Sequence, residues 1–149
     1  MQLIDVNVLV YAFREDAPGH AAYRAWLEAL LASDEAFAVS DQVLASFLRV
    51  VTHPKVFHPP TPLEAAVAFV EAFRGQPNAV TVNPAGRHWE IFLRTSRDAG
   101  ARGNLLPDAW LAALAIEHGC ELVTTDRDFA RFAALRWHHP MAGPRDLAK

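Results

Sequence analysis

Short apolar runs that alternate with helical patterns constrain the fold of this 149-residue chain more than any other feature. Each run is only about four residues long, which is typical of buried strands and too short for a helix. The expected strands lie at 2–5, 36–39, 79–82 and 121–124, with a final edge strand at 135–138. Strands that alternate with helices predict a parallel sheet covered by helices on both faces, with right-handed crossovers.

The segments between these runs place apolar residues at the three-and-four spacing of amphipathic helices. The expected helices cover 7–13, 20–32, 41 up to the stop at His53-Pro54, 63–73, about 86–99 and about 106–118. Ser40 can cap the third helix, and Gly119 is the expected terminator of the last. The helix at 86–99 is expected to turn Trp89, Phe92 and Leu93 inward.

The composition favours one compact domain over residues 1–149, with an irregular tail from about residue 140. The chain is 52% hydrophobic, and a chain of about 150 residues can bury a full-sized core. Its net charge of −3 does not indicate a nucleic-acid binder, although 12 of its 14 basic residues are Arg, which suits phosphate contacts. No stretch approaches the ~20 apolar residues that span a bilayer. A cytoplasmic protein with no membrane contact is expected.

Three acidic residues are placed where strands end or helices begin. Asp5 follows the run Leu3-Ile4, Asp108 lies in the first turn of a helix, and Asp126 follows the run at 121–124. In a parallel sheet, strand ends and the following helix starts share one edge. Carboxylates crowded there repel one another unless a hard cation such as Mg²⁺ neutralises them. The pattern predicts a metal-assisted hydrolytic site for a phosphodiester.

Each of these acids also has a simpler structural interpretation. Asp108 fits a helix-start charge, and Asp126 fits a turn or cap residue. It is the joint placement of the three acids, with Asn7 beside Asp5 and Thr124 before Asp126, that favours a functional site.

The residues at these positions resemble those of the PIN-domain ribonucleases, and among them the VapC toxins of toxin–antitoxin pairs. The resemblance covers nearly the whole chain. It rests on Leu3-Ile4-Asp5-Val6-Asn7-Val8-Leu9, Gln42-Val43-Leu44-Ala45-Ser46-Phe47-Leu48-Arg49-Val50, Pro107-Asp108-Ala109 and Thr124-Thr125-Asp126-Arg127-Asp128-Phe129.

The resemblance implies a three-layer α/β/α sandwich and metal-dependent endonucleolytic cleavage of RNA. It also implies inhibition by a cognate antitoxin. Asp5, Asp108 and Asp126 match the acidic positions of the family and would hold Mg²⁺, with Mn²⁺ as an alternative. Asp128 would assist them, and Asn7 would orient Asp5 or a bound water.

The sequence departs from the family at Ser46, where the family usually has a glutamate. Ser46 retains an oxygen that could hold a metal-bound water, and Arg49 on the same helix face suits phosphate, antitoxin or a site carboxylate. Asp41 lies about 7.5 Å away along the helix axis, which makes direct replacement doubtful. The loss of one carboxylate is expected to weaken cation affinity.

Two other functions fit parts of the pattern. An aspartyl-phosphate phosphatase or receiver-like domain would use Asp5 as nucleophile or phosphoacceptor, but it needs a strand-end Lys, and neither Lys55 nor Lys149 is so placed. The absence of the usual glutamate at Ser46 is consistent with a second alternative, a non-catalytic PIN-like binding module. The apolar faces of the helices at 20–32 and 63–73 predict hydrophobic grooves for an antitoxin helix or for a second copy in a homodimer.

Overall fold

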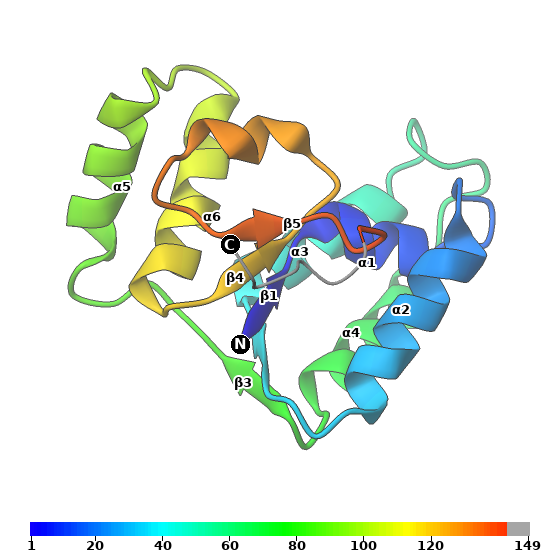
Figure 1. Ribbon diagram of the computed structural model, residues 1–149. Coiled ribbons are helices and arrows are strands. Elements are labelled where there is room, and N and C mark those ends of the chain that lie inside the picture. Colours follow the sequence, from blue (N-terminus) through cyan, green and yellow to red (C-terminus); the bar gives the residue numbers. More distant parts are fainter. Residues whose placement is uncertain (143–149) are drawn as a thin grey trace.

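A computed structural model describes residues 1–142, within which five parallel strands form one sheet (Figure 1). The strands are β1 (Gln2–Ile4), β2 (Phe37–Val39), β3 (Ala79–Thr81), β4 (Glu121–Val123) and β5 (Trp137–His138). Their order in the sheet is β3-β2-β1-β4-β5, and every neighbouring pair is parallel. The sheet confirms the predicted α/β class.

Helices cover both faces of this sheet, so the molecule has the predicted three layers (Figure 1). One face carries α1 (Val6–Phe13), α2 (His20–Ala32), α3 (Asp41–Val51) and α4 (Leu63–Arg74), and the other carries α5 (His88–Asp98), α6 (Leu105–Glu117) and the short 3₁₀-helix η1 (Arg127–Arg131). All the predicted helices and strands are present, with ends shifted by one or two residues. The expected loop at 125–129 instead enters η1, because the Asp126 side chain caps a helical turn there.

The three central strands β1, β2 and β4 are largely buried on both faces, as their unbroken apolar runs indicate, whereas the edge strands β3 and β5 are more exposed. Leu3 and Leu122 point into the core beneath α6, while Ile4 and Val123 point into the core formed with α1 to α4. This alternation follows from the two-residue period of a strand. The alternation determines to which side of the sheet the side chains point at the ends of β1 and β4.

The predicted inward face of α5 is wrong, because the helix is rotated by about one residue relative to the expectation. Trp89 is 60% exposed, whereas His88 is 2% exposed and Ile91 is 3% exposed. His88 can be buried because its Nε2 lies 3.0 Å from the Trp110 carbonyl oxygen, so the ring has a hydrogen-bond partner. Apolar spacing alone does not reveal such a partner.

Helix ends elsewhere agree with the sequence. The Ser40 hydroxyl accepts a hydrogen bond from the Val43 N–H at 3.4 Å, and Gly119 has the positive φ of 64° typical of a residue that ends a helix. Residues 140–142 contain only a turn, and the rest of the expected tail, 143–149, lies outside the described residues. Over residues 1–142 no helix is both long and apolar enough to cross a membrane.

Candidate active site

The acidic residues meet where the order of the sheet reverses. From β1 the chain proceeds outward to β2 and β3, then returns to place β4 on the other side of β1. In open α/β sheets such a switch point leaves a crevice at the carboxyl ends of the strands, and ligands bind there. Asp5 follows β1, Thr124 follows β4, and α6 begins at the same edge with Asp108 in its first turn.

Asp5 is held by a hydrogen bond to each carboxylate oxygen. Its Oδ1 accepts from the Val6 N–H at 2.7 Å, and its Oδ2 accepts from the Thr124 hydroxyl at 2.7 Å. The residue is only 8% exposed. Burial raises the pKa of Asp5 above its ordinary value, the two hydrogen bonds oppose that rise, and the nearby Asp126 adds to it. The two hydrogen bonds thus fix the direction of the Asp5 carboxylate. A nearby cation would favour its ionised form.

Thr124 connects the two strand ends through its buried hydroxyl. While it donates to Asp5, its oxygen accepts from the Asp126 N–H at 3.0 Å and from Asn7 Nδ2 at 3.5 Å. Asn7 Oδ1 in turn accepts from the Thr125 N–H at 3.3 Å. Asn7 therefore hydrogen-bonds both threonines after β4 and reaches Asp5 through the Thr124 hydroxyl.

Asp126 is oriented by the turn that it begins. Its Oδ1 accepts from the Asp128 N–H at 2.9 Å, which caps η1. One oxygen is engaged in this way, and the residue remains partly exposed. Asp128 itself is exposed.

The pKa of Asp108 indicates that the carboxylates at this edge lie close enough to repel one another electrostatically. Partial burial raises the pKa of Asp108 to about 6, and repulsion from Asp126, Asp5 and Asp128 adds to the effect of burial. Four acidic side chains, contributed by three parts of the chain, therefore share one region of negative potential. A cation placed there would relieve the repulsion.

The acids form an open edge rather than a closed cage. Among residues 1–142, no three acidic, histidine or cysteine side chains are already gathered tightly enough to enclose a metal ion. The carboxylates nevertheless lie close enough to affect the ionisation of Asp108. Mg²⁺ suits such an edge, because it commonly takes one or two carboxylates and keeps several of its waters.

Helix α3 adds no further acid to the four at this edge. Ser46 is half-buried, Arg49 is exposed, and within the described part of the chain neither side chain makes a hydrogen bond or ion pair with the acids. Asp41 faces Arg74 instead, with Arg74 Nε 3.0 Å from its Oδ1. Asp41 therefore does not take the place of the glutamate that the family usually has at the position of Ser46.

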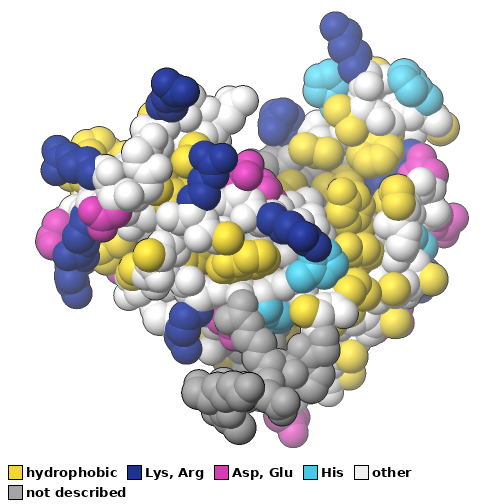
Figure 2. All heavy atoms as spheres, turned by 45° about the horizontal axis from the view of Figure 1, so that its top comes forward, with side chains coloured by type: hydrophobic (Ala, Val, Ile, Leu, Met, Phe, Trp, Pro, Cys, Tyr) yellow, Lys and Arg dark blue, Asp and Glu magenta, His cyan; other side chains and the backbone are white. Residues whose placement is uncertain are grey.

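Basic residues adjoin the acids that follow β4. Exposed Arg127 directly follows Asp126, and exposed Arg131 has its Nε 4.0 Å from Asp128 Oδ1. Figure 2, which turns the top of Figure 1 forward, shows basic and acidic side chains interspersed on this face. Phosphate oxygens are attracted by such cations, and the acids between them would require a metal ion to accept the same substrate. The face can thus receive a polyanion despite the net charge of −3.

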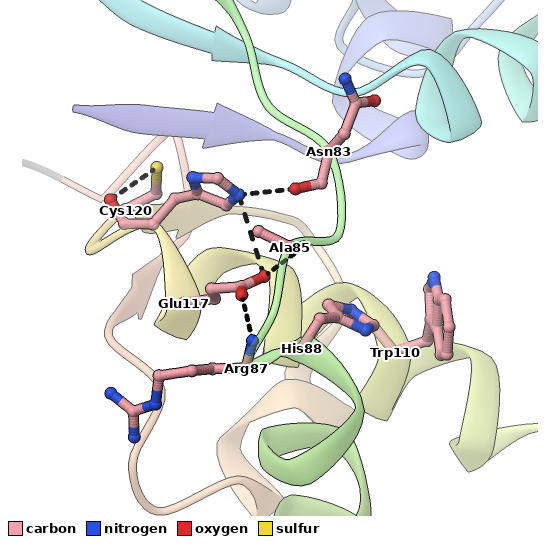
Figure 3. A network of polar contacts seen from close by, with 8 residues as sticks. Asn83, Ala85, Arg87, His88, Trp110, Glu117 and Cys120 are labelled. Carbon is pink, nitrogen blue, oxygen red and sulfur yellow. Dashed lines mark hydrogen bonds and ion pairs between the residues drawn. The ribbon is translucent and has the colours of Figure 1, made fainter.

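The other end of α6, which carries Asp108 in its first turn, is held by Glu117 (Figure 3). The Glu117 carboxylate accepts from the N–H groups of Ala85 and Arg87 at 3.0 and 2.9 Å. His118 Nε2 lies 2.7 Å from the Asn83 carbonyl oxygen and 3.9 Å from Glu117. Glu117 is not among the residues predicted from the sequence. The sequence feature that could have revealed its role is the presence of an acid in the last turn of a helix. The helix dipole disfavours a negative charge there unless a specific partner stabilises it.

Glu117→Gln is expected to destabilise the protein at neutral pH by about 1 kcal/mol, since it removes a charged acceptor of two N–H groups. Burial opposes ionisation of Glu117, but these two bonds and the nearby His118 and His88 hold its pKa below the usual range. A depressed carboxylate pKa adds stability above the unfolded-state pKa of about 4.3, and this stability is lost as the pH falls through the folded-state pKa. Urea unfolding at pH 7 and at pH 3 should therefore show a difference from the parent protein that shrinks in acid. An equal difference at both pH values would contradict this role.

The fold belongs to a known class. A family model described as PIN domain matches residues 3–135 of the chain. The chain therefore belongs to the PIN-domain family.

Similar proteins narrow this class further. Ribonuclease VapC25 of Mycobacterium tuberculosis is 47% identical over 140 residues, which cover 94% of this chain and 99% of that protein. The VapC ribonuclease Mb2897 of Mycobacterium bovis is 46% identical over 147 residues, covering 99% of this chain and all of that protein. Identity of this extent places the chain among the VapC proteins.

Solved structures support the fold independently. VapBC2 from Rickettsia felis, bound to a DNA fragment from its promoter, has a chain that matches with a TM-score of 0.70 at 20% identity, covering 93% of this chain and 97% of that one. VapC20 of Mycobacterium tuberculosis, described as a Sarcin-Ricin loop cleaving toxin, matches with a TM-score of 0.61 at 16% identity, covering 87% and 93%. At such low identity these matches show a shared fold.

Proposed function

We propose that this protein is a metal-dependent endoribonuclease that hydrolyses RNA phosphodiester bonds with Asp5, Asp108 and Asp126. The observation that carries the proposal is the Thr124 hydroxyl, which donates to Asp5 at 2.7 Å and accepts from the Asp126 N–H at 3.0 Å and so holds the acids after β1 and β4 together. Asp108 at the start of α6 lies close enough to these acids for their repulsion to raise its pKa further. The ribonuclease names of the similar VapC proteins support the same activity.

The donor set fits a hard divalent cation. The three carboxylates offer only oxygen ligands, and their mutual repulsion favours neutralisation by Mg²⁺ or Mn²⁺. When bound, the metal ion supplies an activated water and charge stabilisation at the phosphodiester. Asp5 would hold it in a direction set by Val6 and Thr124, while Asp126 is directed by its cap on η1. Asp128, Asn7, Ser46 and Arg49 would support the site or the substrate around these acids.

Metal removal tests the proposal. The purified chain, free of any antitoxin, should cleave single-stranded or structured RNA with Mg²⁺, stop in EDTA, and resume when Mg²⁺ or Mn²⁺ is restored. Asp5→Asn serves as the control, because Asn also caps helices well and removes the charge, together with the acceptor for the Thr124 hydroxyl. Gel analysis of end-labelled RNA gives the cleavage rate. Cleavage that is the same for the parent and Asp5→Asn, with or without metal, would contradict the proposal.

A non-catalytic binding module is the second candidate, favoured by Ser46 in place of the family's usual glutamate and by the open arrangement of the acids. The same experiment separates the two functions. A binding module would retain RNA or protein partners in EDTA and would never produce metal-dependent cleavage.

We further propose that the protein acts in the cytoplasm as a toxin that a cognate antitoxin neutralises, and that it forms a homodimer. Solved chains that share its fold include one from VapBC2 of Rickettsia felis and one from a toxin–antitoxin complex of Klebsiella pneumoniae. A groove of about 410 Å³ lies between α1, α2 and α4, with Leu27, Leu31 and Phe69 among its lining residues. This groove matches the apolar faces expected at 20–32 and 63–73, and it suits an amphipathic antitoxin helix.

A further inference from the structure

The segment between α3 and α4, residues 52–62, is an irregular loop that carries basic side chains and no acid. Figure 1 shows it in teal, projecting at the upper right. Its titratable side chains are those of His53, Lys55 and His58. Lys55 and His58 are exposed, and His53 is half-buried. Although the whole chain has a net charge of −3, this loop favours anions.

The base of the loop is held by Arg14, the residue that follows α1. Arg14 Nη1 donates to the Thr61 hydroxyl at 3.0 Å, and the guanidinium carbon lies 4.3 Å from the centre of the Phe57 ring. Asp16 fixes the guanidinium in turn, accepting from Nε at 2.8 Å and from Nη2 at 2.6 Å. The Thr61 N–H also donates to the Val51 carbonyl oxygen at 2.8 Å. These contacts tie the loop to α1 and α3.

The tip of the loop is a compact turn around His53. The His53 carbonyl oxygen accepts from the N–H groups of Val56 and Phe57 at 3.0 and 3.1 Å, and His53 Nδ1 accepts from the Lys55 N–H at 3.1 Å. Because Nδ1 is the acceptor, the ring proton is on Nε2, which is therefore an N–H donor. A loop that is already ordered loses little entropy when a ligand binds.

The charge of Lys55 is not used within the described part of the chain. Other exposed cations pair with acids, as Arg24 does with Glu28, whereas Lys55 forms no ion pair within residues 1–142. Figure 2 shows a Lys or Arg side chain with a histidine on each side, at the raised corner where Figure 1 places the loop. An ammonium group beside an N–H donor suits a phosphate group.

Helix α1 sets the distance between the loop and the acidic edge. It begins after Asp5 and ends before Arg14, so nine residues at about 1.5 Å each place the anchor of the loop about 14 Å from Asp5. Stacked nucleotides follow one another at about 3.4 Å. An RNA strand with one phosphodiester at the acids would thus reach the loop after about four nucleotides. A polymer with repeated phosphates can contact both places at once.

We propose that the loop at 52–62 is an exosite, a place away from the reacting atoms where the backbone of the RNA substrate binds. Lys55 and the Nε2–H of His53 contact a phosphate about four nucleotides from the bond at the acids, and Arg14 keeps the loop in position. This inference rests on the proposed function and deepens it, because it makes RNA length, rather than base identity, a determinant of affinity.

Fluorescence polarisation at low salt in EDTA tests the exosite without cleavage. The probe is a labelled oligouridylate of about twelve nucleotides. Lys55→Gln should bind it about fivefold more weakly, and the slope of log K against log salt should fall by about one, because one phosphate contact is lost. Lys55→Arg keeps the charge and should bind as the parent does.

Arg136→Gln is the matched control for the loss of one positive charge. Arg136 is exposed and directly precedes β5, so it lies at the amino ends of the parallel strands, opposite to the acids. Its replacement changes the net charge as Lys55→Gln does and should leave RNA binding unchanged. A loss of affinity that is equal in the two variants would show a general effect of charge and would contradict the exosite.

Strand length tests where the exosite lies. On an RNA of about twelve nucleotides with Mg²⁺, Lys55→Gln should raise KM about fivefold and leave kcat unchanged, because the contact is the same in the ground state and the transition state. An RNA of about four nucleotides is too short to reach from the acids to the loop, so the same variant should cleave it with the KM of the parent. Equal effects on both lengths would place Lys55 at the acids and overturn the proposal.

The remaining outcomes separate the exosite from the nuclease activity. Parent-like binding of the longer strand by Lys55→Gln would overturn the exosite even if metal-dependent cleavage is observed, and so would a parent chain that binds no RNA. Weaker binding of a polyglutamate peptide by Lys55→Gln, with RNA affinity unchanged, would assign the loop to an acidic protein instead. Selective loss of RNA affinity in Lys55→Gln, without any cleavage by the parent, would contradict only the nuclease activity.

Discussion

Asp108→Asn is expected to abolish metal-dependent RNA cleavage, by more than about a hundredfold, while stabilising the metal-free protein above pH 6. Burial and repulsion by neighbouring acids raise the pKa of Asp108 to about 6 in the folded state. An acid with a raised folded-state pKa is ionised at a cost, so this destabilisation appears as the pH rises from the unfolded-state value of about 4 to above 6. Asparagine removes it. Solvent screens this half-exposed group, so we expect a gain of about 1 kcal/mol.

Thermal melts at pH 5 and pH 8, with and without Mg²⁺, measure this result. The gain at pH 8 should raise the midpoint by about 2–4 °C in a chain of this size and should be smaller at pH 5. Mg²⁺ should stabilise the parent and have less effect on Asp108→Asn, because binding to the folded state is weakened. Asp98→Asn, at an exposed acid near the end of α5, is the matched control and should change neither quantity. A less stable Asp108→Asn protein at pH 8 would contradict the repulsion.

Thr124→Val should have the largest effect of any change that leaves every charge in place. The hydroxyl is fully buried, donates to Asp5 at 2.7 Å and accepts from the Asp126 N–H at 3.0 Å. Valine has nearly the same shape but leaves a buried carboxylate oxygen and an N–H without their partner. We expect a loss of about 2–3 kcal/mol in the free energy of unfolding and at least a tenfold fall in cleavage rate.

Thr125→Val is the matched control for that change. Thr125 is the next residue and is half-buried, and within residues 1–142 it is the Thr125 backbone N–H, rather than the hydroxyl, that contacts the site. Its replacement should cost less than about 0.5 kcal/mol and leave the rate nearly unchanged. Urea unfolding and cleavage assays on both variants give the comparison. Equal effects at the two positions would show that the Thr124 hydroxyl has no special role.

The order of helices and strands was predictable because each depends on local periodicity. The unbroken run Leu3-Ile4 and the spacing of residues 20–32 specify a strand and a helix wherever they are placed. The position of Asp5, Asp108 and Asp126 at one edge then follows, because parallel strands separated by helices can end only on that side. The rotation of α5 was not predictable from Trp89, since burying His88 depended on a carbonyl oxygen 22 residues away.

By itself, the sequence determined the layered fold, the set of acids on the switch edge, and the absence of the usual glutamate at Ser46. Only the tertiary structure decided how these acids are held and how strongly they repel. The bond from Thr124 to Asp5 spans 119 residues, and the raised pKa of Asp108 depends on acids from two other segments. Hydrogen-bond partners and electrostatic neighbours are set by packing across the fold, whereas strand and helix patterns are written in neighbouring residues.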